Sequence, residues 1–401
     1  MQKIVLFIIT GTLSLGLRSE LPAASFPSTD YPQEDRDDIS ESLEPVREEA
    51  GLPALAAAVV REGRVIALGA AGLRKYGEEV EATPGDRFHL GSCTKAMTAT
   101  LAAILVEEGK LRWDSTLGDV FPELLPTMHS DYLYVTLHLL LMHRGGCPNE
   151  TTPKGVSFVS LHNLPEETMI ERRLHYSRLI LKEPPEEEPG TKYIYSNAGY
   201  VIVGSMMERV TGLAWEELLQ EKLFAPLGIT TAGFGAMGSP GSISEPWQHR
   251  VREDRILPVG PGPRSDNPLV IGPAGTVHMS LEDWSRFVAA HLDGRAGVND
   301  LLSPESWEFL HRLPAGGTYA CGWVVVEREW AGGEALTHAG SNTMNYALVW
   351  ASVKKRFAVL VATNIAKEDT PGVLDQLVWS LITRYLDLQD LLKDQISSSQ
   401  P

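Results

Sequence analysis

The chain has 401 residues, of which 43% are hydrophobic and 22% are charged, with a formal net charge of −17. A chain of this length and apolar content can bury a sizeable core, so we expect one compact unit of two lobes. The acidic balance argues against nucleic acid and anionic membrane surfaces as partners, because both attract basic patches.

The N-terminus has the pattern of a secretory signal. Lys3 precedes the apolar run 4–17, and the small residues Ala23-Ala24-Ser25 follow. The run is too short to span a bilayer. We therefore expect residues 1–24 to be a signal peptide and the mature protein to be periplasmic or secreted, with no stable membrane span; an uncleaved membrane anchor is the alternative.

The first elements of the folded part have clear periodicities. Ile39, Leu43 and Val46 fall at helical spacing and predict an amphipathic helix. The apolar runs 54–60 and 65–68 flank a short polar turn and predict a β-hairpin.

The first chemical signal is a Ser-x-x-Lys sequence, formed by Ser92 and Lys95. Apolar residues at helical spacing follow it as far as Gly109 and predict a long, buried helix that begins at Ser92. Residues three apart share a helix face, so the Lys95 amine can lie against the Ser92 hydroxyl. Burial disfavours a charged ammonium, so Lys95 can be the base for a serine nucleophile. By itself the pair also fits a serine in a turn and a lysine that extends to solvent.

The second signal is Tyr195-Ser196-Asn197, which follows a Pro-Gly turn and precedes a buried helix predicted to end at Gly212. A tyrosine at this place can carry a proton to a leaving group. An asparagine amide both accepts and donates, so Asn197 can hold a substrate amide and the lysine together. Alone, the sequence also fits a turn with a half-buried aromatic residue.

The third signal is His338-Ala339-Gly340, at the end of a strand-like run. A glycine lets another group approach the backbone closely, as the edge of a strand that receives a substrate requires. A lone histidine is more often simply packed or exposed, and only the company of the other two signals favours a role in a site.

The C-terminal part predicts strands over 322–326, 335–338, 346–350 and 357–362 and a closing helix through Val373 to Tyr385. Strands at both chain ends with helices between predict an α/β (α+β) fold. In it, an antiparallel sheet built from both termini is flanked by helices and carries a helical lobe inserted at about 111–269. The domain then covers 36–388, with a tail over 389–401. The Gly- and Pro-rich stretch 235–273 is either a loop near the site or a surface excursion.

Further short sequences accompany the three signals. They are Phe88-His89-Leu90-Gly91, 135–137 with 140–143, Pro189-Gly190, 210–212, 226–228, 275–277 with Asp283, and Gly322-Trp323. With them, the chain resembles the superfamily of serine β-lactamases, DD-peptidases and penicillin-binding proteins over residues 36 to 388. The resemblance is to the branch that holds class C β-lactamases and their esterase and peptidase relatives.

The resemblance implies catalytic roles for three residues. Ser92 would be the nucleophile, and Lys95 and Tyr195 would be the base and proton-transfer pair. The reaction would pass through an acyl-enzyme, and neither a metal ion nor a cofactor is expected.

The resemblance also implies a substrate-binding group. It comprises Asn197, His338, Gly340 and Ser341, with the backbone N–H of Ser341 completing an oxyanion hole with that of the nucleophile. Asn149 is included because the loop that contains it borders the substrate in relatives.

His338 stands where many β-lactamases have lysine, which weakens the case for a β-lactamase. Because the reference pKa of histidine is about 6.5, we expect recognition of anionic substrates to change with pH. The function predicted is that of an exported serine hydrolase acting on small esters, amides or D-amino-acid peptides. A true β-lactamase is one alternative, and a binding protein that kept the fold without turnover is another.

Overall fold

The computed structural model describes residues 36–386. The predicted signal peptide, 1–24, and the predicted tail, 389–401, lie outside this range. The main element is a seven-stranded sheet in the order β1-β3-β2-β12-β11-β10-β9, antiparallel except for the β1–β3 pair. Its strands are β1 (Asp37–Asp38), β2 (Ala54–Arg61), β3 (Arg64–Gly72), β9 (Val324–Arg328), β10 (Gly333–Ser341), β11 (Tyr346–Ser352) and β12 (Phe357–Thr363). The predicted assembly of one sheet from both ends of the chain is confirmed, since β2 pairs with β12.

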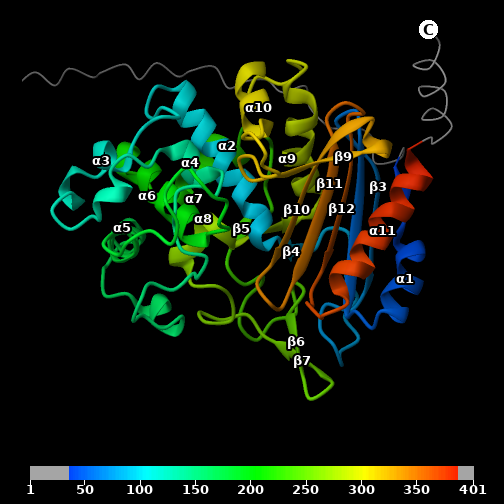
Figure 1. Ribbon diagram of the computed structural model, residues 1–401. Helices are drawn as coiled ribbons and strands as arrows, with labels where there is room; N and C mark the ends of the chain where they lie inside the picture. Colours follow the sequence, from blue (N-terminus) through cyan, green and yellow to red (C-terminus); the bar gives the residue numbers. More distant parts are fainter. Residues whose placement is uncertain (1–35, 387–401) are drawn as a thin grey trace, which may run out of the picture.

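Helices cover both faces of this sheet (Figure 1). On one face lie α1 (Ser40–Glu49) and α11 (Thr370–Tyr385), and on the other lies α9 (Leu281–Gly294). Successive residues of a strand point to opposite faces. In β2, accordingly, Leu55 packs in the cluster that includes α1 and α11, whereas Ala56 packs in the larger core with α9. This arrangement explains why the central strands are continuously apolar.

The remaining elements form the second lobe and its connections to the sheet. The helices are α2 (Thr94–Glu107), α3 (Leu117–Val120), α4 (Leu137–Leu141), α5 (Met169–Leu181), α6 (Asn197–Thr211), α7 (Trp215–Leu219), α8 (Gly272–Gly275) and α10 (Pro304–His311). A small sheet joins β4 (Arg87–His89), β8 (Val277–Ser280) and β5 (Gly233–Phe234), and a hairpin joins β6 (Gln248–Arg252) and β7 (Arg255–Val259). Within residues 36–386, no helix combines the length and the apolar character needed to cross a bilayer.

Helix α2 joins the two lobes. It begins two residues later than the sequence predicts, because Gly91–Cys93 form a 3₁₀ turn before it. Its Thr98 hydroxyl donates to the Pro273 carbonyl at 2.7 Å, and its Thr94 hydroxyl accepts the Val277 N–H at 3.2 Å. These bonds hold the α8 segment against the N-terminal end of α2, where the Ser-x-x-Lys sequence lies.

Candidate active site

Ser92 and Lys95 lie in contact at the start of α2. The Lys95 Nζ is 3.0 Å from the Ser92 Oγ, 2.8 Å from Oδ1 of Asn197 and 2.7 Å from the carbonyl oxygen of Ala274. The lysine side chain is fully buried. Helical spacing therefore places the amine beside the hydroxyl, and two acceptors from elsewhere in the chain complete its surroundings.

The charge state of Lys95 follows from this burial. Removal from water lowers the pKa of Lys95 to about 7, so a large fraction of the amine is neutral near neutral pH. The Asn197 Oδ1 and the Ala274 carbonyl can only accept, so each takes one N–H of the amine. The remaining position, which faces Ser92, then holds the lone pair of the neutral amine. The geometry thus directs a base at the serine hydroxyl.

A second hydrogen bond orients the Asn197 amide. Its Nδ2 donates to the Thr151 hydroxyl at 2.9 Å, which turns Oδ1 toward Lys95. The preceding Ser196 caps α6, because its Oγ accepts the Gly199 N–H at 3.1 Å. Asn197 is therefore held by the start of a buried helix on one side and by Thr151 on the other.

Tyr195 lies on the other side of the lysine. The Lys95 Nζ is 4.8 Å from the centroid of its ring. Burial raises the pKa of Tyr195 above its ordinary value, although a hydrogen bond with the Ser92 side chain lowers it. The phenol is thus protonated at neutral pH, which suits a group that passes a proton on rather than one that removes it.

The turn Gly91–Cys93, which carries the expected nucleophile and is named the nucleophile turn, is in direct backbone contact with the end of β10. A Cβ at Gly340 would lie 2.7 Å from the Ser92 nitrogen, and one at Gly91 would lie 2.3 Å from the Ser341 nitrogen. Gly91 also has a φ of 50°, which favours glycine. Beyond Thr337, β10 no longer pairs with β9, so its last residues form an open strand edge. The two nitrogens of the expected oxyanion hole thus lie at one contact that only glycine permits.

His338 lies at the same strand end, but its ring faces protein groups. Nδ1 is 2.7 Å from the Ala339 carbonyl and so carries the proton, while Nε2 accepts from the Tyr319 hydroxyl at 3.1 Å. The residue is only 5% exposed, and burial with the nearby Lys95 lowers the pKa of His338 to about 3. The expectation that His338 titrates near its reference pKa is therefore wrong, because the ring is removed from water and both of its nitrogens are occupied.

The structure does not bring Asn149 to the other site residues. It is exposed, and its backbone N–H donates to Glu186 at 2.9 Å. Two residues later, Thr151 makes the contact with Asn197. Thr151 could have been found from the sequence as a hydroxyl residue next to the expected substrate loop.

Sequence reasoning also missed an aromatic cluster beside the site. His143 is buried with a φ of 57°, and its ring lies 4.4 Å from that of Tyr195 and 4.6 Å from that of Tyr319. Its Nδ1 accepts the Ser196 N–H at 3.0 Å. His143 belongs to one of the short sequences that carry the resemblance, but Tyr319 stands alone in sequence and gave no such signal.

Comparisons with known proteins agree with this architecture. The profile of the Beta-lactamase family matches residues 39–382. Penicillin-binding protein 4 of Amycolatopsis lactamdurans is 29% identical over 303 residues, which cover 74% of each chain.

Two solved structures share the fold at low identity. The D-amino acid amidase from Ochrobactrum anthropi SV3 superposes with a TM-score of 0.67 at 18% identity, covering 88% of this chain and 98% of the amidase. EstCE1, described as a hydrolase with promiscuous acyltransferase activity, gives a TM-score of 0.67 at 18% identity, covering 85% of this chain and 96% of its own. With a family profile that matches most of its length and a fold shared with these enzymes, the chain belongs to the Beta-lactamase family.

Proposed function

We propose that the protein is a serine hydrolase that forms an acyl-enzyme at Ser92 and acts on small, uncharged esters or amides. The observation that carries the proposal is the arrangement around Lys95. A buried amine with a pKa of about 7 lies 3.0 Å from the Ser92 hydroxyl, with its other hydrogen-bonding positions occupied by acceptors.

The first half-reaction follows from this arrangement. The neutral Lys95 amine takes the hydroxyl proton as the Ser92 Oγ attacks the carbonyl carbon of the substrate, and a tetrahedral oxyanion forms. The N–H groups of Ser92 and Ser341 stabilise the oxyanion where its charge develops. When the bond to the leaving group breaks, the proton held by Lys95 passes through the Tyr195 hydroxyl to the departing alcohol or amine.

The second half-reaction uses the same groups with water as the nucleophile. The neutral Lys95 amine takes a proton from water, relayed through the Tyr195 hydroxyl, as the water oxygen attacks the acyl-enzyme carbonyl. The bond to Ser92 Oγ then breaks, the serine regains its proton, and the acid leaves. The Asn197 amide keeps Lys95 in position throughout, because its own orientation is set by Thr151.

The surroundings of His338 support uncharged substrates. A protonated side chain at this position could form a charge-assisted bond with a substrate carboxylate, which is roughly twice as strong as a neutral one. Here burial keeps the ring neutral, and Tyr319 and Ala339 occupy its nitrogens. Esters and amides without a carboxylate next to the scissile bond therefore fit better than penicillins, and the D-amino acid amidase among the fold neighbours agrees with this preference.

Two alternatives are less well supported. A true β-lactamase would need a group that attracts the β-lactam carboxylate, and His338 does not provide that charge. A binding protein without turnover would not need a serine, a lysine with a lowered pKa and a protonated tyrosine in mutual contact.

Export is part of the proposal. We infer from the sequence that residues 1–24 direct the protein out of the cytoplasm and are removed, leaving the domain over 36–388. N-terminal sequencing of the protein from the culture medium or periplasm tests this inference; an intact Met1 in the exported form would contradict it.

The function is tested by mass spectrometry of the intact protein mixed with a p-nitrophenyl ester, an N-acetyl-D-alanine amide and a penicillin. We expect a transient acyl adduct and turnover with the ester or the amide, and slow or absent acylation by the penicillin. Ser92→Ala removes one hydroxyl from a half-buried turn and should abolish adduct and turnover while Tm changes by only a few degrees. Turnover by Ser92→Ala at a rate comparable to the wild type would refute the assignment.

A further inference from the structure

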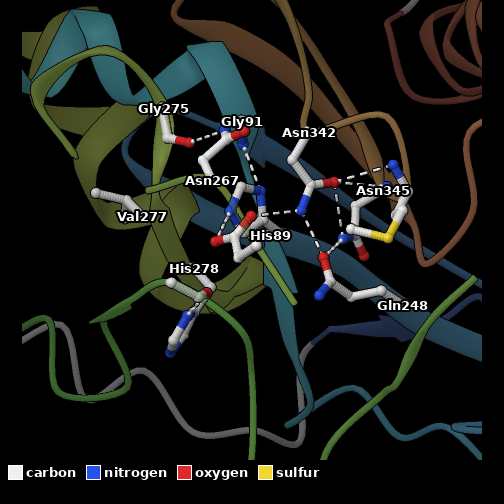
Figure 2. Close-up of polar contacts among 12 residues, drawn as sticks. His89, Gly91, Gln248, Asn267, Gly275, Val277, His278, Asn342 and Asn345 are labelled. Atoms are coloured by element: carbon white, nitrogen blue, oxygen red, sulfur yellow. Dashed lines mark hydrogen bonds and ion pairs between the residues drawn. The ribbon is translucent and has the colours of Figure 1, made fainter. Parts of the chain in front are cut away.

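A hydrogen-bonded network of buried polar side chains lies directly behind the nucleophile turn. The His89 Nδ1 accepts the N–H of Gly91, the residue before Ser92, at 3.0 Å. The His89 Nε2 is 2.8 Å from Oδ2 of Asp266, and Oδ1 of Asp266 accepts from the Asn342 amide at 2.6 Å. Figure 2 shows His89 beside Gly91 on one side of this network and Asn342 on the other.

The protonation of His89 is determined by its partners. A backbone N–H can only donate, so Nδ1 must be the acceptor and the ring proton must be on Nε2. That proton is donated to Asp266. Burial raises the pKa of Asp266, but electrostatic attraction to His89 and hydrogen bonds from His89, Asn342 and the Asn267 backbone together hold the pKa below its ordinary value. Asp266 is thus a carboxylate that accepts from both sides.

At the other end of the network, Asn342 holds the turn that follows β10. Its Oδ1 accepts the N–H groups of Met344 at 3.1 Å and Asn345 at 2.9 Å. In the same turn, the Ser341 hydroxyl donates to the Asn345 carbonyl at 2.7 Å. The residue after Ser341 is therefore tied to Asp266 and to the turn at once.

Gln248 anchors the Asn342 end of the network from a further side. Gln248 Oε1 accepts from the Asn342 amide at 2.5 Å and from the Asn345 amide at 2.7 Å, as Figure 2 shows. Gln248 Nε2 donates to the Ser265 carbonyl at 2.5 Å, next to Asp266. Every side chain of the network is buried, so water does not compete for these bonds.

We propose that Asp266 is a positioning residue for catalysis. By binding His89 on one side and Asn342 on the other, it sets the separation of the Ser92 and Ser341 N–H groups that receive the oxyanion. This inference rests on the proposed function, since it assumes acyl transfer at Ser92. It accounts for one carboxylate holding two segments that are 76 residues or more from it in sequence.

Asp266→Asn is the most direct variant, because it keeps the shape and removes one acceptor. An asparagine presents one oxygen and one NH₂ to two donors, His89 Nε2–H and the Asn342 amide, so one of the two bonds is lost in either orientation. His89 cannot compensate by moving its proton to Nδ1, because that nitrogen would then face the Gly91 N–H. Asn342 cannot turn its amide without exposing the Met344 and Asn345 N–H groups to another donor.

The expected effect is on the transition state. Outright loss of one oxyanion-hole donor lowers kcat by about 10²–10³-fold, so misplacement should lower kcat by about 10- to 100-fold. Because the carbonyl of the bound substrate uses these donors less than the oxyanion does, KM should stay within about threefold of the wild type.

The experiment compares kcat and KM for a p-nitrophenyl ester with the Kd of phenylboronic acid, which forms a tetrahedral adduct on a serine. In Asp266→Asn, the Kd of phenylboronic acid should rise by about the same factor as kcat falls. His89→Asn is the second variant, used also if the first does not fold. Its oxygen can still accept the Gly91 N–H, but the link to Asp266 is broken, so the same pattern is expected.

Asp283→Asn is the matched control. The Asp283 carboxylate is also buried and accepts the N–H groups of Thr230 and Thr231 at 2.8 and 2.7 Å, but it takes no part in the contacts around Ser92. It should lower Tm while leaving kcat and the phenylboronic acid Kd within about twofold of the wild type.

The outcomes separate the two claims. The positioning role is overturned if folded Asp266→Asn and His89→Asn keep wild-type kcat and phenylboronic acid Kd. It is also overturned if Asp283→Asn lowers kcat and raises that Kd as much as they do. If Ser92→Ala still hydrolyses the ester, the proposed function itself has failed, whatever Asp266→Asn does.

Discussion

The Lys95 Nζ lies 2.8 Å from Oδ1 of Asn197, and these two residues are 102 positions apart in the sequence. The Asn197 oxygen removes one N–H of the lysine from competition, as the Ala274 carbonyl removes another. Only with both in place does the remaining position of the neutral amine point at Ser92. The proposed chemistry at Ser92 therefore depends on a residue of α6 as much as on the helix that follows Ser92.

The pKa of Lys95 predicts how activity depends on pH. The amine acts as a base only when it is neutral, and burial lowers its pKa to about 7. The value of kcat/KM for an uncharged ester should therefore fall as pH decreases through about 7 and reach a plateau above it, because this ratio reports ionisations of the free enzyme. A profile without an inflection between about pH 5 and 9 would exclude Lys95 as the base.

Lys95→Arg tests the same group by substitution. A guanidinium stays protonated in proteins, so it can hold a charge at this position but cannot accept the serine proton. We expect kcat to fall by about 10²- to 10⁴-fold. Lys154→Arg is the control, since the Lys154 side chain is 83% exposed and should tolerate the change. Equal activity of the two variants would contradict a base at Lys95.

His338 predicts an absence of pH dependence in substrate charge selection. Its pKa of about 3 means that the ring is neutral at every pH above that value, so its charge does not change in the working range. The ratio of kcat/KM for an anionic and an uncharged ester should therefore be flat from about pH 5 to about pH 9. A ratio that decreases with a midpoint near the reference pKa of histidine would show that the ring is accessible and charged at lower pH. Tyr319→Phe, which keeps the burial, should leave the ratio flat.

Thr151 should affect activity through the orientation of Asn197. In Thr151→Val the hydroxyl that accepts from the Asn197 Nδ2 is lost, and the amide can turn its NH₂ group toward Lys95. A single hydrogen bond of this kind contributes about 1 kcal/mol, so kcat/KM should fall roughly fivefold. Thr151→Ser keeps the hydroxyl and should retain wild-type kcat/KM. If valine and serine behave alike, Thr151 has no part in orienting Asn197.

Arg173 predicts a stability effect away from the site. It is fully buried and pairs with Glu208 of α6 and with Glu216 of α7. Arg173→Met would leave Glu208 buried without its partner, which should lower the free energy of unfolding by about 3–5 kcal/mol. The exposed Arg209, paired with Glu123, is the comparison, and Arg209→Met should cost no more than about 1 kcal/mol. Urea unfolding of both variants measures the difference, and equal midpoints would contradict it.

Local patterns in the sequence were enough to predict the strands of the main sheet other than β1 and the helices α1, α2, α6 and α11. Short apolar runs identified β2, β3, β11 and β12, and the helical spacing after Ser92 identified α2, because both patterns depend on neighbours within a few residues. The assembly of one sheet from both ends of the chain followed from the strands predicted at each end, with helices between them. The stretch 235–273 was harder, because it holds the short hairpin of β6 and β7 and also Asp266, which packs beside the nucleophile turn.

For the site, the sequence by itself determined the Ser92–Lys95 contact, because residues three apart share a helix face. Only the tertiary structure decided what surrounds that pair. The Ala274 carbonyl, 179 positions from Lys95, is a backbone atom with no signature in the sequence. The sequence suggested a titrating histidine at 338 and a substrate contact at Asn149, but it does not show how far each side chain is buried. In the structure, His338 is only 5% exposed, whereas Asn149 is exposed to solvent. Charge state and contact depend on distant segments packing together, and that packing is a property of the whole fold.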